Sequence, residues 1–185
     1  MGEVNSTGEL NRATLARRVH EVCYLQGRFV LRSGQEAGFY FDKYLFESDP
    51  RLLRAIADLA AALVPAGTEM LAGLELGGVP ISTALSLATG LPQVLVRKQA
   101  KTYGTAKLAE GPDITGRRLL VVEDVITTGG QVAASTRDLR DRGGAVDSAL
   151  CVIDRRQGTT ARADRLASAG ISMISLFTVQ DLLEP

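Results

Sequence analysis

Residues 119–131 read LLVVEDVITTGGQ, an apolar run that leads through two acids into a turn of threonine and glycine. The apolar residues predict a buried strand over 119–122, and the turn predicts a helix over 130–142. Free amide hydrogens at a helix start, backed by the helix dipole, bind anions, and glycine lets the backbone close around a phosphate. The segment therefore predicts a strand, a phosphate-binding turn and a helix in succession.

The two acids before the turn, Glu123 and Asp124, separate this segment from other phosphate loops. Carboxylates beside a phosphate would repel it unless they face something else, and the vicinal hydroxyls of a ribose are such a partner. The hydroxyls of Thr127 and Thr128 can donate to the phosphate. Neither G-x-x-x-x-G-K-[ST] nor G-x-G-x-x-G occurs, which argues against nucleoside triphosphatases and dinucleotide enzymes. We therefore expect a site for ribose 5-phosphate.

Outward from this segment, apolar strands alternate with helices along most of the chain. This pattern is typical of an α/β fold with a parallel sheet covered on both faces, which binds ligands at the carboxyl ends of its strands. The expected elements are a helix over 15–23, strands over 28–31 and 39–46 that pair beside the main sheet, a helix over 50–64 that starts at Asp49-Pro50, a strand over 70–74, a helix over 80–88, a strand over 94–97, a long polar segment over 98–116, a strand over 145–153, a helix over 160–169 and a strand over 171–177.

Length and charge bound what the protein can be. The 185 residues suit a single domain over 1–185, with a mobile tail over 1–12. Because 21 Lys and Arg balance 21 Asp and Glu, no overall field draws the chain to nucleic acid or to a membrane surface. Cys23 and Cys151 are too few for a disulfide framework and are expected to pack as small apolar residues. We expect a soluble, cytoplasmic protein.

The acid pair and its turn resemble the phosphoribosyl-pyrophosphate signature of type I phosphoribosyltransferases. Residues 97–105, RKQAKTYGT, resemble the mobile catalytic loop of the orotate phosphoribosyltransferases, and imply a flexible loop over 98–116. By this match the catalytic residues are Arg97, Lys98, Lys101 and Asp124. The resemblance assigns donor binding to Arg32, Gly77, Arg97, Lys98, Lys101, Tyr103, Glu123, Asp124, Val125, Ile126, Thr127, Thr128, Gly129, Gly130 and Gln131.

Two departures from that family are visible. Many bacterial members have His where this chain has Tyr103, and a phenol near its usual pKa of about 10 is a poor acid or base at neutral pH, so we expect Tyr103 to position the donor. Residues 73–80, GLELGGVP, occupy the pyrophosphate loop, where some relatives have Lys at the position of Gly77. Backbone amides there can still hold the diphosphate, and we expect the loop lysines to supply more of the positive charge.

Three further segments resemble the orotate family. Residues 31–34 resemble its L-K-S-G turn, with Arg32 in place of the frequent Lys, residues 39–42 resemble its aromatic segment, and residues 153–155 resemble the I-D-R end of a strand. A guanidinium forks onto a carboxylate through two parallel hydrogen bonds, as recognition of a 6-carboxy pyrimidine requires. The resemblance assigns orotate to Tyr40, Phe41, Thr127 and Arg155.

The resemblance implies transfer of ribose 5-phosphate from 5-phosphoribosyl 1-pyrophosphate to orotate, in the synthesis of UMP. It also implies Mg²⁺ without a direct protein ligand, and a homodimer in which the loop over 98–112 is shared across the interface. Two alternatives stay open: transfer to another nucleobase, and a regulator of the same fold that senses the donor. A regulator usually needs a surface for nucleic acid, which the zero net charge does not favour.

Overall fold

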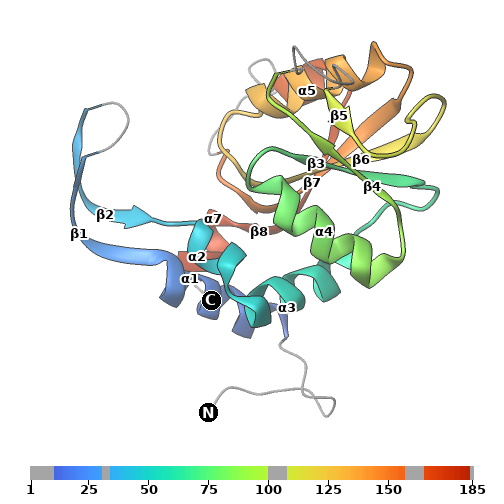
Figure 1. Cartoon of the computed structure of the whole chain (residues 1–185). Helices are drawn as coiled ribbons and strands as arrows, with labels where there is room; N and C mark the ends of the chain where they lie inside the picture. Colours follow the sequence, from blue (N-terminus) through green and yellow to red (C-terminus); the bar gives the residue numbers. More distant parts are fainter. Residues whose placement is uncertain (1–10, 31–33, 100–107, 157–164, 184–185) are drawn as a thin grey trace.

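The computed structural model describes residues 11–30, 34–99, 108–156 and 165–183, which form a six-stranded sheet with helices on both faces and a separate two-stranded hairpin (Figure 1). In chain order the elements are α1 (Arg12–Cys23), β1 (Tyr24–Val30), β2 (Glu36–Phe41), α2 (Tyr44–Ser48), α3 (Pro50–Ala61), β3 (Met70–Leu74), α4 (Gly78–Thr89), β4 (Gln93–Val96), β5 (Ala109–Glu110), β6 (Arg118–Ile126), α5 (Gly130–Arg140), β7 (Ala145–Asp154), α6 (Arg165–Ser168), β8 (Ser172–Thr178) and α7 (Val179–Leu183).

The main sheet has the strand order β5-β4-β3-β6-β7-β8. The sheet is parallel across β4, β3, β6, β7 and β8. The short β5 pairs antiparallel with β4 at the edge. Since parallel strands end at the same edge of a sheet, the loops after β3, β6 and β7 meet there. The predicted parallel α/β sheet is confirmed.

Two apolar cores lie on the two faces of the sheet. Along β6, Leu120 and Val122 point to the core with α1, α3 and α4, and Leu119 and Val121 point to the core with α5 and α6. A strand buried on both faces has to be apolar at every position, which explains the unbroken apolar run. Cys23 and Cys151 are fully buried, one in each core, as expected, and burial raises the pKa of the Cys23 thiol to about 11.

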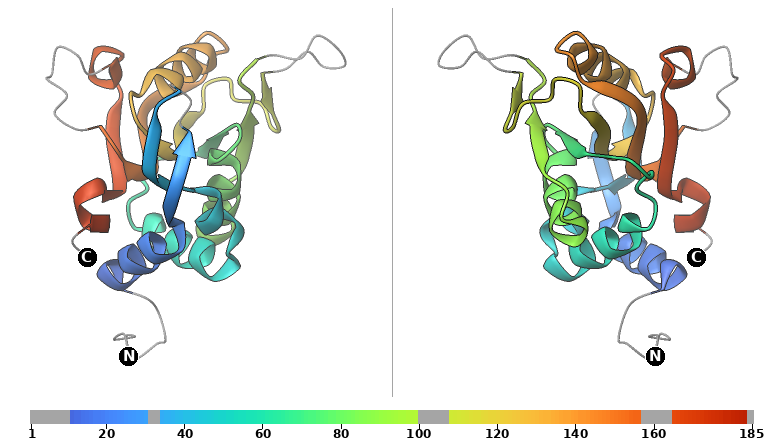
Figure 2. Two further views of the ribbon diagram at one scale, coloured as in Figure 1. Left: turned by 90° about the vertical axis from the view of Figure 1, so that its left-hand side faces the viewer. Right: turned by 90° about the vertical axis from the view of Figure 1, so that its right-hand side faces the viewer.

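The hairpin of β1 and β2 extends away from the main sheet in Figure 1 and lies in front of the rest of the molecule in the left view of Figure 2. Its base is tied to α1, because the amide of Asp42 donates to the carbonyl of Cys23 at 2.9 Å. At the start of α3, Asp49 accepts hydrogen bonds from the amides of Arg51 (2.8 Å) and Leu52 (3.3 Å), as predicted for an N-cap before proline. Along the chain, α2 and α3 therefore lie between the hairpin and β3 of the main sheet.

Several predicted boundaries are wrong. The strand expected over 39–46 ends at Phe41, and α2 follows, because Phe46 turns into the core and the Asp42 carboxylate accepts from the Tyr44 amide at 3.1 Å. The helix expected to reach Val64 ends at Ala61. The strand expected to stop at Val122 continues to Ile126, so the acids lie within β6 and not after it. Pairing with β7 carries the strand on. Helix α7 was not predicted, and β5 lies in the segment expected as a polar loop.

Some expectations fall outside the described residues. The last two residues of the tail expected over 1–12 belong to α1, which begins at Arg12 with Asn11 as its N-cap. Residues 1–10 lie outside the described residues. The same holds for residues 100–107 of the catalytic loop expected over 98–116, and for the first part of the helix expected over 160–169. No helix in the described ranges has the length and apolar character needed to span a membrane.

Candidate functional site

The phosphate turn joins β6 to α5 at the carboxyl edge of the sheet. A small hollow of about 80 Å³ lies in it, lined by Glu123, Val125, Ile126, Thr127, Thr128, Gly129, Gly130, Gln131 and Val132. Gly129 has a φ of 70°, and a Cβ there would lie 2.7 Å from the Leu166 Cγ, so glycine is required. Thr127 and Thr128 are exposed, which leaves their hydroxyls accessible. The turn has the size and the donors to hold one phosphate.

The acid pair lies at the same edge, but deeper than the sequence indicates. Asp124 is fully buried and Glu123 is 8% exposed. The Glu123 carboxylate accepts from the Asp124 amide at 3.0 Å, and the Asp124 carboxylate accepts from the Val125 amide. Glu123 lines the phosphate hollow and Asp124 does not. The two acids therefore point to different surroundings, Glu123 to the turn and Asp124 into the protein.

Two residues that the sequence analysis did not select complete the surroundings of Asp124. The Lys43 ammonium forms an ion pair with the Asp124 carboxylate. Glu47, which is 8% exposed, lies beside the same carboxylate. Lys43 directly follows the aromatic segment 39–42, and this adjacency was the only signal in the sequence. Lys43, Glu47, Glu123 and Asp124, here called the acid cluster, join the hairpin side of the molecule to β6.

Burial and mutual hydrogen bonding set the protonation of the acid cluster. Burial, together with hydrogen bonding to Asp124 and its charge, raises the pKa values of Glu47 and Glu123 to about 9. Burial opposes ionisation of Asp124 as well, but hydrogen bonds with Glu47, Glu123 and Lys43 outweigh it and lower the Asp124 pKa. Asp124 is the carboxylate that remains charged, and protons are held on the acids around it.

The loop between β3 and α4 crosses over the acid cluster at Gly77. A Cβ on Gly77 would overlap the Asp124 Oδ2 and would lie 2.9 Å from the Glu47 Oε1. Glycine at this position therefore lets the predicted pyrophosphate loop lie directly on the acid cluster.

The basic residues of the predicted catalytic loop begin beside this same loop. The Lys98 amide donates to the Glu75 carboxylate at 3.0 Å, and the Lys98 side chain is exposed. The Arg97 guanidinium is paired through its Nε with Glu110 of β5 at 3.1 Å. Predicted site residues Arg32, Lys101 and Tyr103 lie outside the described residues.

A cavity of about 490 Å³ adjoins the end of β7 and contains two of the predicted acceptor residues, Phe41 and Arg155. Its wall includes a stack of rings, with His20 to Tyr24 centroids 4.9 Å apart and Tyr24 to Phe39 centroids 5.1 Å apart. Its lining residues are His20, Tyr24, Phe39, Phe41, Ile153, Arg155, Val179, Leu182 and Leu183. Two other predicted acceptor residues, Tyr40 and Thr127, do not line this cavity.

Arg155 connects this cavity to the phosphate turn. Its amide donates to the carbonyl of Ile126 at 2.8 Å, so its backbone lies beside the residue that precedes the turn. The residues before and after Arg155 in the chain pair with each other. The Arg156 guanidinium donates to the Asp154 carboxylate at 2.7 Å and lowers the Asp154 pKa, against the effect of burial. The Arg155 side chain is exposed. An aromatic wall with one guanidinium suits a flat, anionic ligand.

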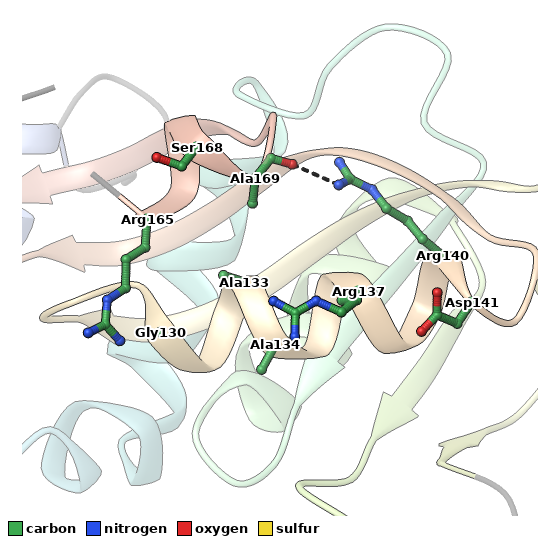
Figure 3. A pocket seen from close by; sticks show the side chains of 9 residues that line it. All are labelled: Gly130, Ala133, Ala134, Arg137, Arg140, Asp141, Arg165, Ser168 and Ala169. Carbon is green, nitrogen blue, oxygen red and sulfur yellow. Dashed lines mark hydrogen bonds between the residues drawn. The ribbon is translucent and has the colours of Figure 1, made fainter. Parts of the chain in front are cut away.

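A further hollow, of about 690 Å³, lies on the outer face of α5 (Figure 3). Of the predicted site residues that the structure describes, only Gly130 borders it. The Arg140 guanidinium is directed to backbone carbonyls, including that of Ala169 at 2.7 Å. This hollow therefore has positive side chains but does not bring the predicted site residues together.

Metal binding by the protein alone has no support in the described ranges. They contain no group of three or more His, Cys, Asp or Glu side chains that could hold a metal ion. Magnesium prefers phosphate and hydroxyl oxygens and usually keeps several waters.

Comparison with known families gives a match over residues 46–175 to the phosphoribosyl transferase domain. The chain is 54% identical to an orotate phosphoribosyltransferase of Nocardioides sp., over 92% of this chain and 93% of that protein. It is 43% identical to an orotate phosphoribosyltransferase of Methanocella arvoryzae, over 85% of this chain and 88% of that protein.

Solved structures give the same result. An orotate phosphoribosyltransferase of Mycobacterium tuberculosis in complex with Fe(III) dicitrate superposes with a TM-score of 0.81 at 36% identity, over 92% of this chain and 98% of that chain. The same enzyme in complex with 5-phospho-alpha-D-ribosyl 1-diphosphate gives a TM-score of 0.77 at 33% identity, with the same coverage. The similarity extends over almost the whole length of both chains.

Proposed function

Since this chain belongs to the orotate phosphoribosyltransferases of the type I phosphoribosyltransferase family, we propose that it transfers ribose 5-phosphate from 5-phosphoribosyl 1-pyrophosphate to N1 of orotate. The products are orotidine 5′-monophosphate and pyrophosphate, in the synthesis of UMP. One observation carries the proposal. The phosphate turn after the acid pair adjoins a cavity with Arg155 in its wall, and the Arg155 amide bonds to Ile126 at 2.8 Å.

The donor is proposed to lie along the carboxyl edge of β6. The amides and hydroxyls of residues 127–131 hold its 5′-phosphate, and Glu123 accepts a hydrogen bond from a ribose hydroxyl. Asp124 is fully buried and has to become exposed to accept a second one. The loop at Gly77 and the side chain of Lys98 meet the diphosphate, together with Lys101 and Arg32 by the family resemblance. The exposed hydroxyls of Thr127 and Thr128 and the ionised state of Asp124 support these roles.

The acceptor is proposed to bind in the cavity of about 490 Å³. Arg155 pairs with the orotate carboxylate, and Phe41 and the ring stack of His20, Tyr24 and Phe39 contact the flat face of the base. Tyr40 and Thr127 are proposed to act from the rim through their backbone and hydroxyl groups.

Catalysis by these residues is a matter of position and charge. The bond from C1 to the diphosphate oxygen breaks, the bond from C1 to N1 of orotate forms, and C1 gains positive character in between. The protein holds donor and acceptor in line and excludes water. Cations aimed at the departing diphosphate stabilise the charge that develops there. No covalent bond to the protein is needed.

Three further properties belong to the proposal. Mg²⁺ binds with the donor, on its phosphate and hydroxyl oxygens, and neutralises the diphosphate. The protein acts as a homodimer in which residues 98–112 serve the partner's site. It works in the cytoplasm, in line with its two buried, unpaired cysteines.

A single assay tests the function. The protein is incubated with the donor and Mg²⁺, and orotate, uracil and purine bases are offered separately while orotate absorbance and pyrophosphate release are followed. We expect turnover with orotate alone. Turnover of a purine or of uracil without turnover of orotate would refute the acceptor and leave the donor in place.

Arg155 is the residue to change in the same assay. Arg155→Leu removes the partner of the orotate carboxylate, so kcat/KM for orotate should fall by about 10²-fold. Binding of the donor without acceptor, measured by calorimetry, serves as the internal control and should stay within about twofold. Unchanged kcat/KM would remove Arg155 from the acceptor site.

A further inference from the structure

Lys43 brings a positive charge to the acid cluster from outside the phosphate turn and the catalytic loop. It follows β2 at the base of the hairpin and precedes α2, and its ammonium forms an ion pair with Asp124 in the main sheet. The Lys43 side chain is 33% exposed, whereas the Asp124 side chain is fully buried. One end of this ion pair is therefore accessible and the other is fixed.

The ammonium of Lys43 lies at the pyrophosphate loop. Its partner atom is the Asp124 Oδ2, which is the same atom that a side chain on Gly77 would overlap. Lys43 and the Gly77 backbone therefore meet at one oxygen. The loop itself has no basic side chain over residues 73–80, so the positive charge at this position comes from the hairpin side.

Carboxyl groups outnumber basic side chains in the described part of this region, although Glu47 and Glu123 hold protons. Glu75, Glu47, Glu123 and Asp124 surround the loop, and a diphosphate would add more negative charge. The Arg97 guanidinium is already paired with Glu110. A bound diphosphate needs a cation close to the loop. Among the described cationic side chains, Lys43 is the one paired with Asp124.

A second observation points to a ligand at the same place. The Glu47 Oε1 is buried and, in the part of the chain that the structure describes, has no hydrogen-bond partner. Buried carboxylate oxygens are ordinarily hydrogen-bonded, because an unpaired one is costly. A buried oxygen without a partner therefore lies beside Asp124 and Lys43, and the Lys43 ammonium has donors left after its bond to Asp124.

We propose that Lys43 is a donor-binding residue, whose ammonium keeps its bond to Asp124 and donates its other hydrogens to the diphosphate of 5-phosphoribosyl 1-pyrophosphate. The proposal rests on the function proposed above and adds to it the residue that neutralises the donor at the Gly77 loop. Lys43 would hold Asp124 toward the ribose and the diphosphate toward the loop at the same time.

Calorimetry without any acceptor tests the proposal. Pyrophosphate and the intact donor, each with Mg²⁺, are titrated into the wild type, Lys43→Met, Lys43→Arg and Arg54→Met, an exposed cation on α3 that serves as the matched control. We expect both ligands to bind Lys43→Met about 10-fold to 100-fold more weakly, because a charged hydrogen bond is lost. Lys43→Arg should recover most of the affinity, and Arg54→Met should equal the wild type.

A structural role alone gives a different result. If Lys43 only neutralises Asp124, Lys43→Met lowers the melting temperature but binds pyrophosphate as the wild type does, and the proposal is overturned. Should Lys43→Met not fold, Lys43→Gln, which can still donate to Asp124, gives the same comparison.

The acceptor-free design separates this inference from the proposed function. A wild type that binds the donor but does not convert orotate would refute the acceptor, while the comparison of Lys43 variants would still decide the role of Lys43. A wild type that binds neither the donor nor pyrophosphate would overturn both.

Discussion

Single residues at the carboxyl edge of β6 decide how the site is charged. Asp124 stays ionised because Lys43 and the protons held on Glu47 and Glu123 stabilise its charge against burial. Gly77 makes this arrangement possible, since any side chain there would occupy the position of the Asp124 carboxylate. The ionised acid, its cation and the loop that covers them therefore depend on one another.

Gly77→Ala should disturb the acid cluster directly. Its Cβ would overlap the Asp124 Oδ2, so the loop must move, and we expect a loss of about 1–3 kcal/mol in the free energy of unfolding and at least about 10-fold weaker donor binding. Urea unfolding and calorimetry measure the two effects. Gly38→Ala is the matched control, because a Cβ at Gly38 meets nothing within 4 Å. Equal behaviour of the two variants would contradict the described packing.

Glu47→Gln should change how stability depends on pH. Burial raises the pKa of Glu47 to about 9, so the folded protein keeps a proton that the unfolded chain releases above about 4.5. Stability of the wild type should therefore fall as pH rises between these values. Glutamine at position 47 takes up no proton on folding. As pH rises, the free energy of unfolding of Glu47→Gln should therefore increase relative to that of the wild type by on the order of 1 kcal/mol per pH unit.

Unfolding in urea at several values between pH 6 and pH 8 measures this difference. Glu69→Gln is the control, because the Arg118 amide and the neighbouring arginines hold the Glu69 pKa below its usual range, outside that interval. A stability difference between Glu47→Gln and the wild type that does not vary with pH would mean that Glu47 is ionised in the folded protein.

At the scale of elements, arginine side chains hold the helices of the second core face against the sheet. Arg140, near the end of α5, donates from its guanidinium to the carbonyls of Val146 in β7 (Nε at 2.9 Å) and of Ala169 after α6 (2.7 Å), as Figure 3 shows for Ala169. It donates to Gly170 as well, at 3.2 Å. One side chain therefore connects α5, β7 and the turn before β8, and keeps the phosphate-binding helix in place.

Arg140→Ala should therefore be strongly destabilising for a partly exposed position. Backbone carbonyls lose charged hydrogen bonds, and we expect a loss of about 2–3 kcal/mol in the free energy of unfolding, measured in urea. Arg137→Ala on the same helix borders the same hollow and should cost less than about 0.5 kcal/mol. Similar losses for both variants would show that the Arg140 contacts are not important for stability.

At the scale of the whole molecule, the first and last described helices close the fold. Arg12 at the start of α1 donates to the Leu176 carbonyl at 3.0 Å, pairs with Asp181 of α7 at 2.8 Å and lies 5.3 Å from the centre of the Phe177 ring. These contacts bring α1 against α7 and the end of β8, next to the cavity that contains Arg155. Contacts between the two ends of the chain therefore shape the wall of the site.

Arg12→Met should loosen this closure in a pH-dependent way. The Arg12 guanidinium and the Thr178 amide hold the Asp181 pKa below its usual range, so their stabilisation is present above about pH 4 and is lost as pH falls through the folded pKa. We expect a loss of about 1–2 kcal/mol at pH 7 and a smaller loss at pH 3. Arg18→Met, an exposed residue of α1 paired with Glu21, is the control. A loss independent of pH would mean that packing on Phe177 dominates.

The sequence by itself determined the parallel sheet, the phosphate turn and the chemistry of its ligand. Local patterns suffice for these, because a strand buried on both faces must be apolar throughout, and the turn at residues 127–130 is formed within a few consecutive residues. The tight match at β3, predicted over 70–74 and found at Met70–Leu74, follows from the same reasoning. Where the sequence erred, at α2 and at the end of β6, long-range contacts overrode the local pattern: Phe46 enters the core and β7 extends β6.

Only the tertiary structure decided which charges meet. Lys43 and Glu47 are far from Asp124 along the chain and carry no local signature, yet the fold brings them together under Gly77. In the same way, the cavity that contains Arg155 is formed where α1, the hairpin, β7 and α7 meet. The physical reason is that burial and electrostatic contact depend on distances between elements, which side-chain periodicity along one element does not specify.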